Sequence, residues 1–485
     1  MIGLQPRYEE GTRMPQVQMS PLDIYNLLPK TNCKKCGEEN CISLATKLIN
    51  REVTLEQCPQ LLDEMNKNAY QKLSEMLNPP VKEITIGVGD KAKKIGGKLV
   101  LYRHELTYVN PTIIAIDVTD EMGDKDFLKR LKDVEDFSYN YIGSILTLDM
   151  IAIRSTSNDP KKFNKTIRKF SESSNLPAIL CSFNPKVIEE GLVIIGTKKP
   201  LIYAANKDNW KEMADLAITY HCPLVVFAPN DLPLLKSLAR TLLQYGVKDL
   251  VLDSGSFLEE GLTDTLNNFT MLRKAAIREN DEFLGFPLLG VPLTVWLEHN
   301  DPPEVATWNE TWFASMLITR FADILIMHSL EGWSQLPLNI LKNNLYADPR
   351  KPVTVEAGLK AFGTPNELSP LMFTTNFALT YYTVKVDIEV GKIDCYLLIV
   401  DTEGIAVESA VAGRKLTAEI VAKALKKYDV EHKVKHRKII IPGKAARLSS
   451  EIEEISGWKV IVGPMDSSGI PKFVREEWPT KLAES

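Results

Sequence analysis

The fold can be predicted from residues 200–228, PLIYAANKDNWKEMADLAITYHCPLVVFA. Two short apolar runs, PLIYAA and PLVVFA, stand on either side of a polar stretch that carries apolar residues at helical spacing. Runs that are short, unbroken and rich in Ile, Val and Leu are typical of parallel strands buried on both faces. The stretch therefore predicts a strand, a helix and a second strand.

The same unit recurs between residue 81 and about residue 347. Eight apolar runs alternate with segments of helical length, and they begin at Thr112, Leu146, Pro177, Pro200, Pro223, Asp249, Phe286 and Ala322. Eight strand–helix units over roughly 250 residues have the size and rhythm of a (β/α)8 TIM barrel. The alternative is a doubly wound sheet, which would more often show a Gly-rich turn after its first strand.

One turn of that kind follows the strand-like run EITIGV. Gly87, Gly89 and Ala92 match the pattern G-x-G-x-x-A of dinucleotide-binding proteins. That site needs a helix after the turn, so that a phosphate can lie at the helix N-terminus. Here Gly96 and Gly97 lead into another strand-like run instead. We therefore predict a hairpin that caps the floor of the barrel.

Four of the seven cysteines lie close together before the barrel. Cys33, Cys36, Cys41 and Cys58 have the spacing C-x2-C-x4-C-x16-C, and Pro59 follows the last of them. A structural zinc site usually uses two C-x-x-C pairs, whereas one is present here. Iron–sulfur loops accept uneven spacing and often end in Cys-Pro. The pattern favours a [4Fe–4S] cluster, with a zinc site and plain thiols as the alternatives.

Prolines mark two boundaries along the chain. LNPP, residues 77–80, ends a helical pattern because Pro80 forces Pro79 out of helical geometry. A second boundary falls around Asp348–Pro352, and the residues after it alternate strands and helices like a small open α/β sheet. We expect an α/β multidomain protein with an N-terminal extension at 1–20, a small 4Fe-4S cluster domain at 21–80, a TIM barrel at 81–348 and an open-sheet α/β domain at 349–485.

The composition of the 485-residue chain excludes several classes of protein. With 44% hydrophobic and 25% charged residues, it has enough apolar material for more than one core. The net charge of −5, without a basic stripe, argues against nucleic-acid binding. No apolar run has the length of a membrane span, and the first residues lack the core of a signal peptide. We expect a cytoplasmic protein in which Cys181, Cys222 and Cys395 are buried small hydrophobes.

Six stretches together are specific for one family. They are SPLDIYNLLPKTNCKKCGEENC (20–41), EITIGVGDKAKKIGGKLVLYRHELT (83–107), IRSTSNDPKKF (153–163), YAANKDNWKE (203–212), SPLMFTTNFALTYYTV (369–384) and VIVGPMDSSGIPKF (460–473). From about Ser20 to Trp478, the chain resembles the large subunit of the corrinoid iron–sulfur protein. In archaea this is the gamma subunit of the acetyl-CoA decarbonylase/synthase complex, and two of the stretches lean towards the archaeal branch.

The resemblance implies a methyl carrier with methyltransferase activity inside a complex. In this family the cobalt of a bound corrinoid takes a methyl group from a methyl-tetrahydropterin and passes it to the nickel centre of acetyl-CoA synthase. The [4Fe–4S] cluster returns an electron that the cobalt sometimes loses. The implied partners are a small corrinoid iron–sulfur subunit, which forms a heterodimer with the large one, and the acetyl-CoA synthase and carbon monoxide dehydrogenase subunits.

The family is also known for a base-off corrinoid, in which no histidine of the protein lies below the cobalt. Many cobalamin methyl carriers supply that histidine from the motif D-x-H-x-x-G. Aspartate stands two positions before none of the six histidines of this chain, which are His104, His221, His299, His328, His432 and His436. The sequence therefore agrees with the absence of a histidine lower ligand.

The resemblance also implies which residues meet the corrin ring. The stretch FTTNFALTY contacts the ring in the family, which gives Thr374, Thr375, Asn376, Phe377 and Ala378. Hydroxyl and amide groups can bind the amide arms of the ring. A second group comprises residues of turns, where small side chains allow close backbone approach: Gly404, Gly413, Gly443, Ala445, Ala446, Gly463 and Pro464. The alternative interpretation is a strand end and ordinary turns held by Asn and Thr side chains.

Polar residues at the barrel strand ends would favour a catalytic interpretation. They are Asp117, Asp149, Asn206, Asp253 and His328. The resemblance implies instead that this barrel is mainly a scaffold, and Asp and Asn at strand ends commonly cap the next helix. We therefore predict no catalytic side chain here. The alternative function for the whole chain is a non-corrinoid electron-transfer or scaffold subunit with an iron–sulfur or zinc module.

Overall fold

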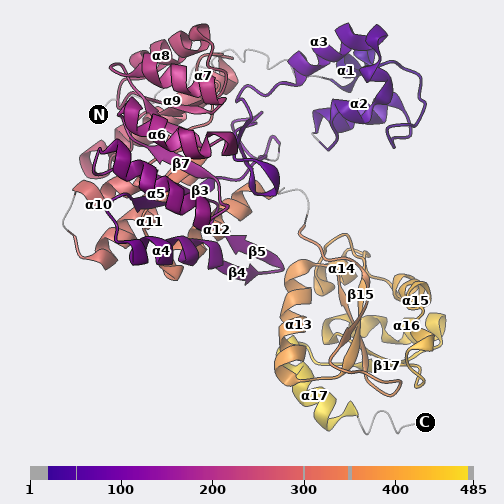
Figure 1. Cartoon of the computed structure of the whole chain (residues 1–485). Coiled ribbons are helices and arrows are strands. Elements are labelled where there is room, and N and C mark those ends of the chain that lie inside the picture. The colour runs from indigo at the N-terminus through magenta and orange to yellow at the C-terminus, as the bar shows by residue number, and fades with distance from the viewer. Residues whose placement is uncertain (1–19, 51, 107, 299–300, 348–351, 479–485) are drawn as a thin grey trace, which may run out of the picture. The chain divides into compact units, whose positions relative to one another are not determined.

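The computed structural model describes residues 20–478 apart from 51, 107, 299–300 and 348–351 (Figure 1). Of the expected N-terminal extension, all but Ser20 lies outside the described residues. The expected boundary between residues 348 and 349 lies outside them as well. Within the described part of the chain, no helix is long and apolar enough to cross a membrane.

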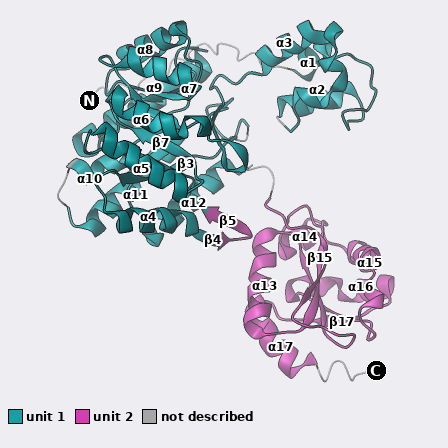
Figure 2. Cartoon of the chain, in the orientation of Figure 1, with its two compact units in different colours: residues 1–138, 147–347 teal, residues 139–146, 348–485 magenta. Residues whose placement is uncertain are grey.

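The chain forms two compact units (Figure 2). The first consists of residues 1–138 and 147–347, and the second of residues 139–146 and 348–485. The short strands β4 (Ser138–Tyr141) and β5 (Ser144–Thr147) pair with each other, so most of this hairpin is grouped with the second unit.

Three helices form the N-terminal part of the first unit, the front helical group: α1 (Pro21–Leu27), α2 (Cys41–Ile49) and α3 (Lys67–Leu77). Ser20 begins α1 with a capping box, in which it and Asp23 bond to each other's backbone N–H. Asn40 caps α2 by accepting a hydrogen bond from Ser43 N. The helices pack around a small apolar cluster of their own, which includes Ile24, Leu44, Leu48, Leu61 and Leu73.

The eight predicted apolar runs all form strands of one parallel sheet. They are β3 (Ile113–Thr119), β6 (Met150–Arg154), β7 (Ala178–Cys181), β8 (Leu201–Ala205), β9 (Leu224–Phe227), β10 (Leu250–Asp253), β11 (Leu289–Gly290) and β12 (Ile324–Met327). Their order is β10-β9-β8-β7-β6-β3-β12-β11. A parallel bridge between Leu252 and Leu288 joins the two ends of this order. The sheet is therefore a barrel, and the alternative of a doubly wound sheet is excluded.

Helices follow the strands around the barrel (Figure 1). They are α4 (Asp124–Asp136), α5 (Pro160–Ser173), α6 (Pro185–Ile195), α7 (Trp210–Tyr220), α8 (Leu232–Tyr245), α9 (Leu262–Arg278), α10 (Val295–Glu298), α11 (Pro303–Thr319) and α12 (Gly332–Tyr346). Helices α5, α6 and α8 begin in the same way. The side chains of Asp159, Asn184 and Asp231 accept hydrogen bonds from backbone N–H groups of the first turn, and each first turn contains a proline. Both features favour a helix start.

A hairpin lies on the floor of the barrel, as the glycine pattern predicts. Strands β1 (Ile84–Ile86) and β2 (Lys93–Ile95) pair antiparallel, so the motif at Gly87 is followed by a strand and not by a long helix. Gly87 N donates to Lys199 O, which precedes β8. Gly96 has a φ of 73°, and a Cβ there would lie 2.2 Å from Lys82 O. Glycine is therefore required at this close approach.

The second unit contains an open sheet of five strands. They are β13 (Gly358–Phe362), β14 (Leu371–Thr375), β15 (Cys395–Val400), β16 (Lys438–Ile441) and β17 (Lys459–Val462), in the order β13-β15-β14-β16-β17. The edge strand β13 is antiparallel and the others are parallel. The chain passes from β14 to β15 on one side and then crosses to β16 on the other. The carboxyl ends of β14 and β16 therefore flank a topological switch point.

Helices cover both faces of this sheet (Figure 1): α13 (Ala378–Gly391), α14 (Val407–Ala412), α15 (Ala418–Lys427), α16 (Ser449–Ser456) and α17 (Ile470–Glu476). Each face has its own apolar cluster. Leu371 and Phe373 belong to one cluster, and Met372 belongs to the other. This alternation follows from the period of two along a strand. The predicted open-sheet α/β domain is thus confirmed.

A buried ion-pair group joins three strands at the floor of the barrel. The Asp323 carboxylate lies 2.8 Å from Lys98 Nζ and 2.6 Å from an Arg273 nitrogen, and it accepts a hydrogen bond from Leu288 N at 2.8 Å. All three charged side chains are buried. Burial alone would raise the pKa of Asp323, but the charges of Lys98 and Arg273 lower it. Asp323 O also accepts from Ile113 N, so β3, β11 and β12 meet at this residue.

Asp323→Asn should destabilise the barrel strongly, because it leaves Lys98 and Arg273 buried without a counter-charge. We expect the free energy of unfolding to fall by about 3–5 kcal/mol in urea titrations followed by circular dichroism. Glu121→Gln is the control, since its pair with Lys162 at 3.6 Å is exposed and should be worth at most about 1 kcal/mol. Equal effects of the two substitutions would contradict the assigned role of Asp323.

Candidate functional site

The carboxyl edge of the second sheet collects most of the residues predicted to bind a cofactor there. Thr374 and Thr375 end β14, Asn376 and Phe377 follow it, and Ala378 begins α13. The turns after the neighbouring strands carry the second group, at Gly404, Gly443, Ala445, Ala446, Gly463 and Pro464. Parallel strands bring these segments together although they are far apart in the sequence. Gly413 differs, because it caps the far end of α14 and not a strand.

Thr374 and Thr375 are buried at the end of β14 next to the switch point. Their exposed fractions are 2% and 0%, and within the described residues neither hydroxyl has a hydrogen-bond partner. A buried hydroxyl without a partner carries a desolvation cost that a ligand acceptor would remove. The two hydroxyls are therefore suited to hold a ligand that has hydrogen-bond acceptors.

Asn376 uses its side chain to hold the turn after β15. Its Oδ1 accepts from Thr402 N at 2.9 Å and from Gly404 N at 3.0 Å. Its Nδ2 donates to Asp401 Oδ1 at 2.9 Å, and its own N–H donates to Val400 O. The amide is thus engaged within the chain, as the alternative interpretation of this stretch expects. Asn376 shapes the edge by fixing the turn to β14.

The turns after β16 and β17 are bound to each other through their backbones. Gly443 N donates to Pro464 O at 3.0 Å, and Gly463 N donates to Ile441 O at 2.9 Å. A Cβ on Gly443 would lie 2.8 Å from Met465 Sδ and 2.9 Å from Met465 N. The small residues therefore allow the two turns to approach closely, so that the carboxyl ends of β16 and β17 are joined side by side.

The cysteine loop lies in the front helical group. Cys33 and Cys36 are partly exposed on the loop before α2, while Cys41 begins α2 and Cys58 precedes a 3-10 turn; both are buried. Gly37 turns the loop with a φ of 86°. Asn32 Oδ1 accepts from Cys41 N at 2.9 Å.

A further hydrogen bond, from Thr31 Oγ1 to Gln60 Oε1, ties the start of the loop to the segment around Cys58. Burial raises the pKa of the Cys58 thiol, and nearby Cys36 and Cys41 act in the same direction. These couplings bring the cysteines from two segments into one neighbourhood.

All seven cysteines of the chain are free thiols. The four in the loop are the ones that the sequence predicts as ligands. Thiols of this kind can bind either a zinc ion or an iron–sulfur cluster.

The remaining cysteines have the properties of small hydrophobes. Cys181, Cys222 and Cys395 are buried in or beside strands, and burial raises the pKa of each thiol to about 12. They are therefore neutral and unreactive at physiological pH.

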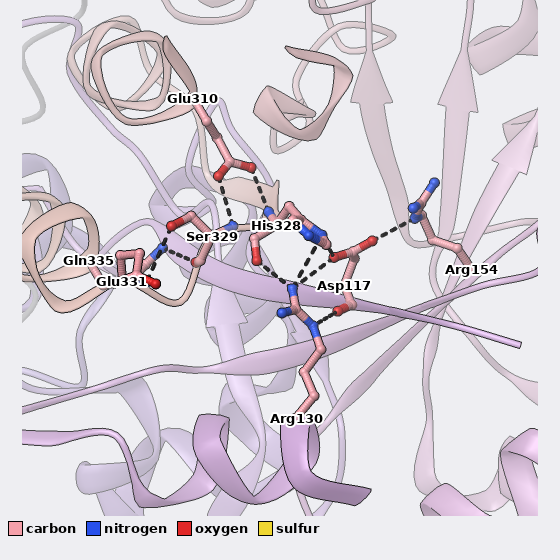
Figure 3. A network of polar contacts seen from close by, with 8 residues as sticks. All are labelled: Asp117, Arg130, Arg154, Glu310, His328, Ser329, Glu331 and Gln335. Carbon is pink, nitrogen blue, oxygen red and sulfur yellow. Dashed lines mark hydrogen bonds and ion pairs between the residues drawn. The ribbon is translucent and has the colours of Figure 1, made fainter. Parts of the chain in front are cut away.

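A polar network occupies the carboxyl end of the barrel (Figure 3). The Asp117 carboxylate on β3 lies 2.6 Å from His328 Nδ1, 3.1 Å from an Arg130 nitrogen and 2.9 Å from Arg154 Nε. Arg130 also donates to His328 O. Glu310 on α11 is buried, and it accepts from the backbone N–H groups of His328 and Ser329. The sequence pointed to Asp117 and His328 but not to the arginines or Glu310.

The other polar strand-end residues have separate partners. Asp149 is not at a carboxyl end, because β6 begins at Met150; the carboxylate bonds to Lys93 and Lys342 on the floor. Asn206 Oδ1 accepts from the backbone N–H groups of Asp208 and Asn209 in the turn before α7, whose N-cap is Asn209 and not Asn206. Asp253 ends β10 and accepts from Tyr203 Oη at 2.9 Å, and burial raises its pKa to about 7.

The comparisons with known proteins cover nearly the whole chain. The family model described as CO dehydrogenase/acetyl-CoA synthase delta subunit matches residues 83–474, and the one described as "Putative Fe-S cluster" matches residues 28–60. Acetyl-CoA decarbonylase/synthase complex subunit gamma 2 of Methanosarcina thermophila is 48% identical over 469 residues, which cover 95% of this chain and 99% of the relative.

Subunit gamma of the acetyl-CoA decarbonylase/synthase complex of Methanothermobacter thermautotrophicus is 44% identical over 458 residues, which cover 94% of this chain and 99% of the relative. Among solved structures, dihydropteroate synthase of Thermus thermophilus has a TM-score of 0.37 and 16% identity, and it matches 54% of this chain and 99% of its own.

Asn376→Ala should loosen the turn after β15, because the N–H groups of Thr402 and Gly404 lose their acceptor while buried. We expect the free energy of unfolding to fall by about 1–3 kcal/mol. Hydrogen exchange at the Gly404 amide should also become faster. Lys444→Ala, which removes an exposed pair with Glu408, is the control and should change neither quantity markedly. An unchanged rate of hydrogen exchange at the Gly404 amide in the Asn376→Ala variant would contradict the role of Asn376 in holding this turn.

Asp253→Asn should stabilise the chain increasingly as the pH rises. The pKa of Asp253 is raised to about 7 in the folded state, so between pH 4 and pH 7 the folded chain binds the proton and the unfolded chain does not. Wild-type stability then falls by up to about 1.4 kcal/mol per pH unit relative to D253N, and the difference is constant above pH 7. Urea titrations at pH 5, 6, 7 and 8 measure it, with exposed Asp208→Asn as control. A pH-independent difference would contradict the raised pKa.

Proposed function

Because the chain belongs to the family described as CO dehydrogenase/acetyl-CoA synthase delta subunit, we propose that it is a corrinoid methyl carrier in an acetyl-CoA decarbonylase/synthase complex. Relatives that match it over nearly their whole length are named as subunit gamma of that complex. The observation that carries the proposal is the pair of buried, unpartnered hydroxyls of Thr374 and Thr375 at the switch point of the second sheet.

The residues of this edge fit a large ligand with many amide groups. Thr374 and Thr375 would donate hydrogen bonds to it, and the backbone of the turns at Gly404, Gly443 and Gly463 would line it. Asn376 would act indirectly, by holding the Gly404 turn in place. When bound, a corrinoid supplies a cobalt centre that takes up a methyl group and releases it to an acceptor.

The proposed corrinoid has no protein imidazole below its cobalt. In the described part of the second unit there are two histidines. His436 precedes β16 and contacts Ser369 O at 2.9 Å, which is at the amino end of the sheet. His432 lies in η8 (Val430–His432), and 80% of its side chain is exposed. Neither follows a strand at the carboxyl edge.

The front helical group would hold the iron–sulfur cluster through Cys33, Cys36, Cys41 and Cys58. A bound [4Fe–4S] cluster supplies single electrons, which here would restore the reduced state of the corrinoid. The chain's own residues prepare the site. The hydrogen bond of Asn32 to Cys41 N fixes the first cysteine-bearing segment, and that of Thr31 to Gln60 ties it to the segment of Cys58. Apolar side chains pack around the buried Cys41 and Cys58.

The proposed reaction is methyl transfer between a methyl-tetrahydropterin and the nickel centre of acetyl-CoA synthase. The proposed partners are the small corrinoid iron–sulfur subunit and the acetyl-CoA synthase and carbon monoxide dehydrogenase subunits. Support comes from the relatives, which are named as subunits of the acetyl-CoA decarbonylase/synthase complex.

Replacing Thr374 and Thr375 by Val should weaken corrinoid binding without harming the fold. Each lost hydrogen bond of about 1.4 kcal/mol should raise the dissociation constant about tenfold. The corrinoid-free variants should be at least as stable as wild type, since the hydroxyls have no partner to lose. Thr383→Val, whose hydroxyl bonds to Leu379 O within α13, is the control. Titration with cobalamin followed by absorbance gives the affinities, and unchanged values would contradict the site.

Cys36→Ala tests the role of the cluster in the full chain loaded with corrinoid. We expect the labelled methyl group of a methyl-tetrahydropterin to reach pre-reduced C36A chain as it does wild type. Reductive reactivation after oxidation should be lost, and the iron content should fall. Cys395→Ala, which changes a buried strand residue, is the control and should keep both the reductive reactivation and the iron content of wild type. Normal reactivation in C36A would remove the cluster from the mechanism, and absence of methyl uptake by wild type would reject the proposed function.

A further inference from the structure

The polar network at the carboxyl end of the barrel is not used in the methyl carriage proposed above for the second sheet. It lies where (β/α)8 barrels bind their ligands. Figure 3 shows Arg130 and Arg154 approaching the Asp117 carboxylate from different sides. The side chains of both arginines and of His328 are between 17% and 30% exposed, whereas Asp117 is fully buried. Arg130, Arg154 and His328 therefore reach solvent.

Arg154 is only partly used by the protein. Its Nε lies 2.9 Å from Asp117 Oδ2, and within the described residues its two terminal nitrogens have no partner. Asp117 also serves Arg130 and His328, so its charge is shared among three groups. Cys181, which pairs with Arg154 in the sheet register, is a neutral thiol and offers no counter-charge. An anchored guanidinium with free N–H groups matches a carboxylate or a phosphate.

Three aromatic side chains, the aromatic wall, lie on or directly after the strands β7, β8 and β9, which follow the strand of Arg154 in the sheet. Cys181 on β7 is in register with Tyr203 on β8, so Arg154 and Tyr203 are separated by two strand spacings, or about 10 Å. The rings of Phe183, Tyr203 and Phe227 contact one another with centroids 5.4–6.1 Å apart. Phe183 is 45% exposed, so one face of this wall is open.

The loop that follows Arg154 is held by several hydrogen bonds to one carboxylate. The Asp120 carboxylate accepts hydrogen bonds from the backbone N–H groups of Thr156 and Ser157 and from the hydroxyls of Ser155, Thr156 and Ser157, at 2.6–3.1 Å. These residues directly follow Arg154 at the end of β6. A fixed loop keeps the guanidinium in place before a ligand arrives, which lowers the entropic cost of binding.

We propose that the carboxyl end of the barrel binds a small ligand in which a flat aromatic ring carries an anionic group. The anion would accept from the terminal N–H groups of Arg154, and the ring would lie against Phe183. The site goes beyond the proposed methyl carriage, in which the corrinoid is assigned to the second sheet and the iron–sulfur cluster to the cysteine loop. Carboxylates and phosphates share this recognition, so both are used as probes.

Calorimetric titration of the full chain with 2-naphthoate, 2-naphthyl phosphate and the neutral 2-naphthamide tests the site. At least one of the two anions should bind about tenfold more tightly than the amide, since only the anions gain charge-assisted hydrogen bonds. The tighter of the two identifies the anionic group as a carboxylate or a phosphate. Equal binding of all three probes, or no binding of any of them, would overturn the proposal.

Two variants connect the result to the named residues. Arg154→Met should remove the preference for the anion, while Arg168→Met on the outer helix α5 should keep it. Because Arg154→Met also breaks an ion pair, Phe183→Ala provides a second test at a side chain that is 45% exposed and lies outside the apolar core of the barrel. Phe183→Ala should raise the dissociation constants of all three probes by a similar factor. Anion binding unchanged in either Arg154→Met or Phe183→Ala would overturn the site.

Discussion

Parallel strands joined by helices place their carboxyl ends at one edge of the sheet, and the eight strands of the barrel and four of the five strands of the second sheet follow that constraint. In the barrel it brings Asp117 and His328 together although they are 211 positions apart. In the second sheet it gathers the ends of β14, β15 and β16 around Thr375, Gly404 and Gly443. Each candidate site outside the cysteine loop depends on this arrangement, because no short segment of the sequence contains one.

The sequence alone predicts much of the fold because the physical signals are local. Strands buried on both faces must be apolar throughout, so all eight barrel strands are visible as runs. The glycine signal is also local: Gly96 and Gly97 lead into a second strand-like run where a dinucleotide site needs a helix, and the structure has a hairpin there. One interpretation was wrong: Asp149 is not a carboxyl-end residue. The run that begins at Leu146 contains the end of β5 and the whole of β6, so its aspartate lies at the amino end of β6.

The candidate sites are less predictable, since their contacts depend on the closed sheet. Arg130 and Glu310 lie on helices, where a polar residue normally faces solvent, and only the barrel turns them towards Asp117 and His328. In the second sheet, Thr375 and Asn376 are neighbours of similar polarity. The structure separates them, because the Asn376 amide is fully engaged and the Thr375 hydroxyl has no partner among the described residues.

Three parts of the chain differ in the side chains they offer. The cysteine loop has four thiols, the carboxyl end of the barrel has charged groups, and the second sheet has two buried hydroxyls. We propose that one polypeptide holds both the corrinoid and the iron–sulfur cluster. The cobalt-to-iron ratio of the full chain, purified without oxygen, tests this most directly. We predict about one cobalt and about four iron atoms per chain. Iron or zinc without cobalt would contradict the claim.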